Sequence, residues 1–469
     1  MNTTGKYSYF NETVSQLTRR RYWSVLALCV SGFFFIRNAQ YVKRWEEPNS
    51  PIQWDVISYY EYLPAIFIHH DWSLSFLDEH PELEGKYWHS KGPDNSRVIR
   101  TSMGMSLLYL PFFVAGHISA NALGYPTDGF SDPYEVSLIY GSIIYCLIAL
   151  WILRNVLRRY VSDFASALTI LSLSIGTNLF YYTSVEGPMS HAWLFMLYAA
   201  LLYCTIRLNE SGGKSKYFYF ISLLSGVMVL CRPTEIVVII IVLLYGIRSI
   251  KDFIAHFRKL VIPYHRSALG ILLFVAPFFL QMCYWKDVTG TWLYYSYQEY
   301  GFFFDSPMIV DGLFSYRKGW LVYTPLASFF LFGFILLYKR QRQLFWPIIV
   351  WCVANIYITF SWCIWWYGGS FGMRALIQGT ALLSINMALL YDFALRNYRY
   401  FFWVIILGFY FIRLNLFQTR QFLNSLIHWD SMTKDAYWYV FERREMTREN
   451  WTELEGYLQA PDYEARTKK

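Results

Sequence analysis

Long apolar stretches recur along the whole chain and are separated by short polar segments. Examples are WSVLALCVSGFFFI (23–36), VSLIYGSIIYCLIALWIL (136–153) and LASFFLFGFILLY (326–338). A helix needs about 20 apolar residues to cross about 30 Å of hydrocarbon, and many of these stretches approach that length. The pattern therefore predicts an all-α polytopic membrane protein.

We expect about eleven of these stretches to cross the membrane. They lie at about 23–40, 135–153, 163–182, 189–206, 217–231, 235–247, 267–285, 320–338, 344–362, 375–395 and 400–414. The first stretch has no small-residue cleavage site, so it is expected to be retained as a span. The stretch 103–123 is expected to lie on or partly in the outer leaflet. If it crossed, the basic residues Arg154, Arg158 and Arg159 would face outward.

Basic residues cluster between the apolar stretches and orient the chain. The clusters are Arg19, Arg20 and Arg21; Arg154, Arg158 and Arg159; Arg207, Lys214 and Lys216; Arg248, Lys251, Arg258 and Lys259; Lys339, Arg340 and Arg342; and Arg396 and Arg399. The positive-inside rule makes these clusters cytoplasmic. We therefore expect a cytoplasmic N-terminus (1–22), a transmembrane domain (23–415) with large outer loops at 41–134 and 286–319, and an outer C-terminal tail (416–469).

Composition adds little beyond this topology. The chain is 55% hydrophobic, 21% aromatic and only 16% charged, whereas soluble proteins carry about 25% charged residues. The net charge of +8 is explained by the basic loops, so we expect no nucleic-acid partner. The seven cysteines show no paired spacing, and neither a disulfide framework nor a zinc site is indicated.

This threading gathers the unusual polar residues on the outer face. They are Asp55, Glu61, His69, His70 and Asp71 of the first loop, Glu186 and His191 of SVEGPMSHAW, Arg232 of CRPTE, and the loops 286–319 and 361–374. Between the short spans around it, CRPTE is expected to turn below the outer surface. Charge at that depth is tolerated only inside a protein-lined space.

The outer acids and histidines admit different interpretations. Asp55 lies between aromatic residues close to the end of the first span, which favours a chemical role. Glu61 lies six residues further on and is interpreted as a solvated loop acid. The HHD sequence (69–71) lacks a ligand spacing that would indicate a metal, so surface histidines are expected. For Glu186 and His191, a polar helix start and a substrate contact both stay open.

Three cations on the outer face could hold an anion. Arg232 and Arg374 lie between apolar helices beside Pro or Gly, and Lys318 follows another basic residue. Snorkelling to lipid headgroups is one interpretation, and a grip on a phosphate through charge-assisted hydrogen bonds is the other. The aromatic residues of WWYGGSFGMR, such as Trp366 and Tyr367, could stack on sugar rings or form an interfacial belt.

The motifs YLPA, SHA, RPT, GLFSYRKGWLVYTP and WWYGGSFGMRAL follow one another in this order. Together they make the chain resemble the GT-C class of integral-membrane glycosyltransferases over residues 20–415, particularly bacterial members of family 39 or mannosyltransferase-like proteins. The resemblance implies a GT-C-like fold in a bacterial inner membrane. It also implies a polyprenyl-phosphate-linked sugar donor and transfer to a hydroxyl on the periplasmic side. The acceptor, whether a glycan, a lipid or a protein, is left undefined.

The resemblance also implies roles for individual residues. Asp55 matches the family's catalytic base. The phosphate contacts fall to Arg374, Arg232 and Lys318, and the remaining substrate contacts to Glu186, His191, Tyr59, Trp366 and Tyr367. No second acid adjoins Asp55, so we expect neither a cofactor nor a catalytic metal. The alternatives from other classes are a transporter or flippase of lipid-linked sugars, which should show repeated halves, and a non-catalytic assembly subunit.

Overall fold

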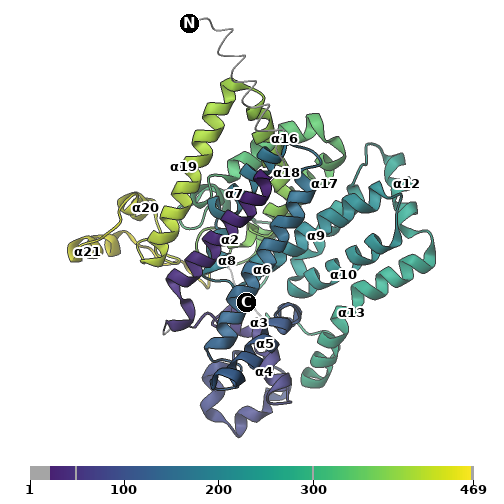
Figure 1. Cartoon of the computed structure of the whole chain (residues 1–469). Coiled ribbons are helices and arrows are strands. Elements are labelled where there is room, and N and C mark those ends of the chain that lie inside the picture. Colours follow the sequence, from purple (N-terminus) through teal and green to yellow (C-terminus); the bar gives the residue numbers. More distant parts are fainter. Residues whose placement is uncertain (1–21, 48–49, 298–299, 466–469) are drawn as a thin grey trace, which may run out of the picture. The chain divides into compact units, whose positions relative to one another are not determined.

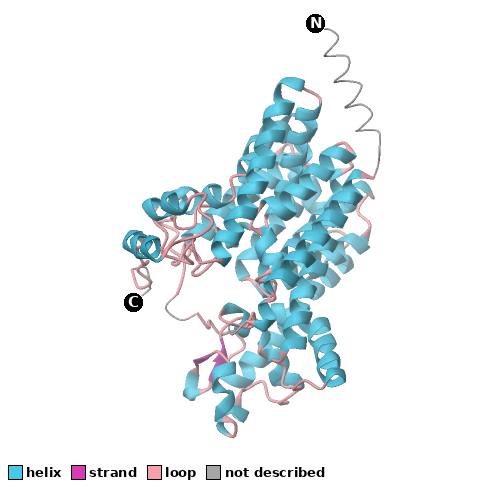
Figure 2. Ribbon diagram, turned by 60° about the vertical axis from the view of Figure 1, so that its left-hand side comes forward, coloured by secondary structure: helices cyan, strands magenta, loops and turns pink. Residues whose placement is uncertain are grey.

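The computed structural model describes residues 22–47, 50–297 and 300–465 and is nearly all helical (Figures 1 and 2). The expected cytoplasmic segment before the first span lies, apart from its last residue, outside the described residues. The chain divides into two compact units. The first consists of Met1–Phe35, Leu147–Tyr181 and Gly301–Lys469, and the second of Ile36–Cys146 and Tyr182–Tyr300.

The elements follow one another without any large sheet. The α-helices are α2 Trp23–Val42, α3 Asp55–Tyr60, α4 Tyr62–Phe67, α5 Gly104–Leu123, α6 Asp132–Leu157, α7 Asp163–Gly176, α8 Leu179–Ser184, α9 Ser190–Glu210, α10 Ser215–Cys231, α11 Ile239–Leu244, α12 Ile250–Val261, α13 Tyr264–Thr289, α14 Ile309–Phe314, α15 Trp320–Tyr323, α16 Ala327–Arg340, α17 Arg342–Ser361, α18 Thr380–Leu395, α19 Tyr398–Leu423, α20 Lys434–Val440 and α21 Arg448–Tyr457. The short 3-10 helices are η1 Arg44–Glu46, η2 Ser75–Asp78, η3 Pro81–Lys86, η4 Pro93–Asn95, η5 Pro233–Val238 and η6 Arg374–Leu376. The strands β1 His89–Lys91 and β2 Arg97–Ile99 pair antiparallel and form the magenta hairpin in Figure 2.

Each of the eleven predicted stretches is helical, but several are divided. The stretch 163–182 breaks into α7 and α8 at Thr177, whose backbone is extended. The stretch 235–247 begins as the 3-10 helix η5, with Pro233 at its first position, where a missing N–H costs no helical hydrogen bond. The last stretch was predicted too short, since α19 continues to Leu423.

Seven described helices are long and apolar enough to cross a membrane, judged by length and composition. They are Trp23–Glu46, Gly104–Leu123, Asp132–Leu157, Ser190–Glu210, Tyr264–Thr289, Arg342–Ser361 and Tyr398–Leu423. Six of these contain a predicted span, and Gly104–Leu123 is the stretch that was expected to lie on the outer leaflet. The other five predicted spans are shorter or divided helices. A multi-pass membrane protein is therefore supported, while the number of eleven spans stays a prediction.

Helix α5 belongs to the second unit and contacts the ends of its neighbours. Just before it, Ser102 donates its hydroxyl to the carbonyl of Leu230 at the end of α10. Further along, the His117 ring nitrogen Nδ1 lies 2.6 Å from the hydroxyl of Tyr134 at the start of α6. In the predicted threading these helix ends are on the same side of the membrane. The contacts support our placing α5 along that surface, which stays a prediction.

The first outer loop of the second unit folds around a small aromatic core. Tyr62, Leu74, Tyr87, Val98 and Ile99 are buried there. The ring of Tyr62 meets the ring of Tyr284 edge to face at 5.1 Å, which ties the loop to α13. Buried aromatic side chains remove large apolar areas from water and dominate the stability of such small cores. This core holds the hairpin β1–β2 and helices α3 and α4 in place.

Helix α18 is the buried centre of the first unit. It packs against α7, α16 and α19, and 14 of its 16 residues are buried. A helix that is apolar all round is typical of the interior of a large protein or a membrane bundle. Most of its polar side chains have partners: the Asn386 amide nitrogen donates to the Phe330 carbonyl at 3.1 Å, whereas Asn386 Oδ1 has no partner among the described residues. The centre of this unit is therefore a helix that the sequence predicts to be a span, and its side chains pack mainly against other parts of the protein.

Candidate active site

Asp55 opens helix α3 directly after a strained residue. Its predecessor Trp54 has φ 51° and ψ −129°, a conformation that L side chains rarely adopt, and the Trp54 side chain is 77% exposed. Buried side chains such as Val56 and Tyr60 anchor helix α3. Backbone strain of this kind costs about 1–3 kcal/mol and clusters at functional sites. The strain therefore fixes the half-buried carboxylate of Asp55 at an exposed edge of the loop.

Tyr297 marks the place where three separate segments of the second unit meet. Burial is the main reason that the pKa of Tyr297 is raised to about 12, and the negative charge of Asp55 adds to the rise. The positive charges of Arg232 and Arg100 act in the opposite direction. The charges of all three groups therefore act on this hydroxyl. Arg100 comes directly after β2, and Arg232 directly after α10.

Arg100 was not identified as a site residue in the sequence analysis. Its guanidinium carbon lies 4.9 Å from the ring centre of Tyr300, 5.5 Å from that of Tyr297 and 5.8 Å from that of Trp88. Cation–π contacts of this kind hold the fork of an arginine in one orientation. In the sequence, Arg100 is only a cation that follows the apolar pair Val98 and Ile99. This pattern does not identify a site unless the fold is known.

The arrangement around Tyr297 combines one carboxylate with two guanidinium groups. A carboxylate can accept the proton of a hydroxyl when it lies within hydrogen-bond reach. Guanidinium groups stabilise a phosphate oxygen that gains negative charge, through paired charge-assisted hydrogen bonds. Asp55, Arg232 and Arg100 therefore provide, within one unit, the groups for a displacement at a phosphate-linked carbon.

Glu61 is not the solvated loop acid that we expected. It is fully buried, and one of its carboxylate oxygens accepts the Trp88 backbone N–H at 2.8 Å. The other oxygen has no hydrogen-bond partner among the described residues. Burial raises the pKa of Glu61 well above its usual range, although the hydrogen bond from Trp88 partly opposes this. Burial therefore favours the protonated form of this carboxyl group. Its hydrogen bond holds Trp88, whose ring faces Arg100.

The other predicted substrate contacts of the second unit have internal contacts of their own. Glu186 lies 3.5 Å from a guanidinium nitrogen of Arg44. His191 is buried at the start of α9, and its ring meets that of Tyr182 at 5.1 Å, nearly edge to face. Tyr59 is buried in α3. Their role as substrate contacts stays a prediction.

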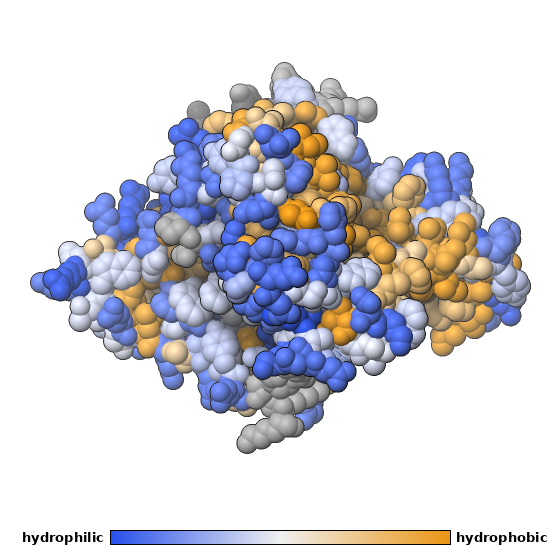
Figure 3. All heavy atoms as spheres, turned by 90° about the horizontal axis from the view of Figure 1, so that it is seen from below, coloured by the Kyte–Doolittle hydropathy of each residue, from blue (hydrophilic) through white to orange (hydrophobic). Residues whose placement is uncertain are grey.

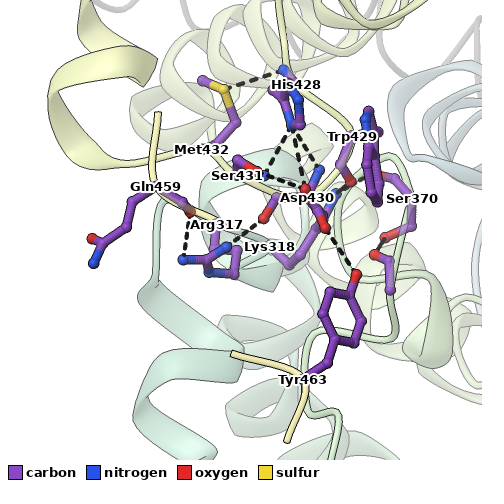
Figure 4. Close-up of polar contacts among 11 residues, drawn as sticks. Arg317, Lys318, Ser370, His428, Trp429, Asp430, Ser431, Met432, Gln459 and Tyr463 are labelled. Atoms are coloured by element: carbon purple, nitrogen blue, oxygen red, sulfur yellow. Dashed lines mark hydrogen bonds and ion pairs between the residues drawn. The ribbon is translucent and has the colours of Figure 1, made fainter. Parts of the chain in front are cut away.

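Lys318 and the residues of the motif WWYGGSFGMR lie in the first unit. The Lys318 ammonium is buried and donates hydrogen bonds to the carbonyls of Ser370 and Trp429. Burial lowers the pKa of Lys318 to about 7; Asp430 opposes the shift, while Arg374 and Arg317 add to it. Arg374, which begins η6, is therefore close to Lys318. Figure 4 shows the amine pointing into this group of contacts.

The two predicted aromatic contacts of this motif differ. Trp366 is buried, and its ring meets that of Tyr463 at 5.3 Å. Tyr367 has a positive φ of 57° and donates its hydroxyl to the Thr359 carbonyl at 3.0 Å. Both therefore help to shape the loop, and a sugar contact for either stays a prediction.

The C-terminal tail folds back onto the same loop. Arg317 donates to the carbonyls of Asp430 at 2.5 Å and Gln459 at 3.0 Å, and the Tyr463 hydroxyl donates to the Asp430 carboxylate at 2.8 Å (Figure 4). The sequence placed this tail outside the membrane without giving it a role. The tail therefore packs beside Lys318 and accepts a hydrogen bond from it through the Trp429 carbonyl.

Metal-ligating side chains do not converge in the described part of the chain. There, no group of three His, Cys, Asp or Glu side chains could hold a metal ion. The ring of His69 stacks on that of Phe76 at 4.0 Å. Asp71 accepts hydrogen bonds from Ser73, Ser75 and the Phe76 backbone, and so shapes its own loop.

Residues 130–280 match the model of a protein family described as dolichyl-phosphate-mannose-protein mannosyltransferase. This match supports the GT-C class. It covers about a third of the GT-C-like chain and includes Arg232, whereas Asp55 and Arg374 lie outside it. The family match therefore supports a membrane glycosyltransferase without testing the catalytic residues.

A solved structure with a similar arrangement is the oligosaccharyltransferase of Archaeoglobus fulgidus, crystallised with a tethered acceptor peptide that contains the NVT sequon. It is 15% identical to this chain, with a TM-score of 0.48, and the likeness covers 95% of this chain. The chain spans 60% of the length of that protein. A search among curated proteins found no match.

Proposed function

We propose that this protein is an inverting membrane glycosyltransferase. It moves a sugar from a polyprenyl-phosphate donor to a hydroxyl group of a glycan, lipid or protein acceptor. The reaction takes place on the outer, periplasmic side of a bacterial inner membrane, opposite the basic loops. The N-terminus is then cytoplasmic and the C-terminus periplasmic. The reaction needs no organic cofactor and involves no catalytic metal.

The mechanism is a direct displacement at the anomeric carbon. The Asp55 carboxylate takes the proton of the acceptor hydroxyl while that oxygen forms its bond to the anomeric carbon. The bond between this carbon and the phosphate oxygen breaks, and its electron pair leaves with the lipid phosphate. Arg232 and Arg100 stabilise the charge that develops on the phosphate, because guanidinium groups form forked hydrogen bonds to phosphate oxygens.

The observation that carries this proposal is that the charges of Asp55, Arg232 and Arg100, from three segments of one unit, all act on Tyr297, with Arg100 5.5 Å from its ring centre. The strained backbone before Asp55 supports it. In the first unit, the buried Lys318 amine is already engaged with two carbonyls. Arg374 and Lys318 stay the predicted donor contacts from this unit.

The proposal is tested with purified protein in liposomes and a panel of radiolabelled polyprenyl-phosphate sugars with candidate acceptors. Wild type should form a labelled product, and Asp55→Asn should lower kcat by about 10²–10⁴-fold, because the amide cannot accept the proton. The matched control is Glu79→Gln, which neutralises an exposed acid of the same loop and should keep full activity. Undiminished transfer by Asp55→Asn would remove the base from the proposal. Movement of the donor across the bilayer without transfer would favour the flippase.

Arg100 gives a second test of the same site. Arg100→Lys keeps the charge but loses the planar fork and its stacking on three aromatic rings. We expect kcat/KM for the donor to fall by about 10–100-fold, a loss of about 1.4–2.7 kcal/mol. Lys91→Gln, an exposed cation on the neighbouring strand, serves as the control. Equal activity of Arg100→Lys and wild type would show that Arg100 does not contact the donor.

A further inference from the structure

Helix α12 exposes an apolar stripe that the rest of the second unit does not cover. The stripe consists of Ile250, Phe253, Ile254 and Phe257, which are 81%, 38%, 49% and 48% exposed, and of Val261. Their spacing of three and four residues puts them on one face of the helix. A short helix with a broad apolar face and a charged opposite face is typical of a helix that lies in the plane of a membrane surface.

The protein fixes this helix from both ends without using the stripe. At its start, the Ser249 hydroxyl accepts the Asp252 backbone N–H at 3.1 Å, and the Asp252 carboxylate accepts the Arg248 N–H at 3.1 Å. At its end, the buried guanidinium of Arg266 donates to the carbonyls of Lys259 and Leu260. Both ends are therefore capped, and the orientation of the exposed face is set by the fold.

The same orientation is fixed at the middle of the helix. His256 contacts the Val242 carbonyl through Nε2 at 3.0 Å, and Leu260, one turn further, is buried. These two residues lie on the side that packs against the protein. The apolar stripe continues from Leu260 away from the protein, so it is presented outward.

Two cations lie along the other edge of the stripe. Lys251 and Arg258 are seven residues apart and so share one flank of the helix, and both are exposed. Neither forms an ion pair with an acid among the described residues. Asp252 is the one acid in the helix sequence and is engaged at its start. The helix therefore presents a positive flank beside an apolar face, which complements an anionic lipid surface.

Helix α13, which begins three residues after α12, also exposes apolar side chains. On α13, Ile271, Leu272 and Phe279 are 66%, 62% and 61% exposed, and this helix is one of the candidate spans. Figure 3 shows apolar side chains gathered at the right, over the part that holds α10 and α13 in Figure 1. A chain that crosses the bilayer through α13 brings α12 to the level of the headgroups.

We propose that α12 is an interfacial helix that binds anionic phospholipid of the leaflet on the side of the basic loops, which the predicted topology makes the cytoplasmic leaflet. The apolar stripe enters the boundary between headgroups and acyl chains. Lys251 and Arg258 contact the lipid phosphates, as cations near an anionic surface do. This role is independent of sugar transfer.

Hydrogen exchange of residues 250–261, followed by mass spectrometry, tests the proposal. The full-length protein is placed in nanodiscs of phosphatidylcholine alone, or with about one third of phosphatidylglycerol added. We expect exchange of α12 to be at least about fivefold slower with phosphatidylglycerol, because both cations then have lipid phosphates to contact. Equal exchange in both lipids would overturn the preference for anionic lipid.

Two double variants separate the contributions. Lys251→Gln with Arg258→Gln should remove the effect of phosphatidylglycerol, whereas Lys214→Gln with Lys216→Gln, an equal change of charge at the start of α10, should keep it. Ile254→Ser with Phe257→Ser should speed exchange in both lipids. If the first variant keeps the lipid effect, or if the serine variant exchanges like wild type, the proposed binding mode is wrong.

Discussion

Two acids six residues apart in the first outer loop have opposite environments. Asp55 is half-buried directly after a strained tryptophan, and its charge acts on Tyr297 together with those of two arginines. Glu61 is fully buried where the two helices α3 and α4 meet, and burial raises its pKa. The sequence could favour Asp55, because its position next to a span was visible. It could not show the burial of Glu61, which depends on Trp88, Tyr87 and Tyr284 from distant segments.

Replacing Glu61 by glutamine, which carries no charge at any pH, should stabilise the outer loop at neutral pH. Above about pH 4.5 the carboxyl group ionises in the unfolded loop but stays protonated in the folded loop, so stability falls as pH rises. Glu61→Gln keeps an acceptor for the Trp88 N–H and has no charge to lose. We expect the apparent melting temperature at pH 7 to rise by a few degrees, for a gain of about 1 kcal/mol.

Thermal unfolding of Glu61→Gln, wild type and the exposed control Glu79→Gln at pH 5 and pH 7 measures this effect. The difference between Glu61→Gln and wild type should be larger at pH 7 than at pH 5, and the control should follow wild type. A variant that is less stable than wild type at both pH values would show that Glu61 is charged when folded.

At the scale of elements, the close packing of α10 against α13 depends on a small residue. A Cβ atom added at Gly226 of α10 would come within 2.2 Å of the Phe274 backbone oxygen of α13. Small residues let helices in membranes approach closely enough for backbone contact, where apolar burial alone gives no driving force. The sequence predicted both helices but not their contact, because many glycines in the chain have no such neighbour.

Gly226→Ala should therefore destabilise the second unit by about 1–3 kcal/mol, the usual cost of overpacking a tight contact. The matched control is Gly456→Ala in helix α21, where an added Cβ would have nothing within 4 Å. This change should be neutral or stabilising by about 0.5–1 kcal/mol, since alanine favours the helix. Thermal unfolding in detergent compares the two, and equal melting temperatures for both variants would contradict the close packing.

At the scale of the whole molecule, the sequence predicted the positions of the helices well and their partners poorly. The apolar runs define almost every span, because a helix in hydrocarbon needs a continuous apolar segment. The group around Lys318 was only half visible: the cation stood out, but Asp430 and Tyr463 come from a tail with no apolar pattern. Arg100 was hidden for the same reason. Contacts between distant polar segments depend on the fold, and the hydrophobic periodicity of the sequence does not predict them.

The same long-range contacts predict that pH acts oppositely on two parts of the molecule. Between pH 5 and 7 the outer loop around Glu61 should lose stability, because the folded carboxyl keeps a proton that the unfolded one releases. Lys318 behaves in reverse: its pKa is about 7 when folded and 10.5 when unfolded. Between pH 7 and 9 the unfolded amine therefore binds more protons than the folded one, and the stability of the tail around it rises.

Hydrogen exchange by peptide, corrected for the intrinsic effect of pH, separates these parts. Peptides from 56–68 should be less protected at pH 7 than at pH 5, and peptides from 428–441 more protected at pH 9 than at pH 7. Lys318→Met removes the titrating amine and leaves the carbonyls of Ser370 and Trp429 without their donor, so it should lower protection of the tail at every pH. It should also remove the rise between pH 7 and 9. If the variant tail still gains protection with pH, another group is responsible, and the neutral Lys318 is excluded as the cause.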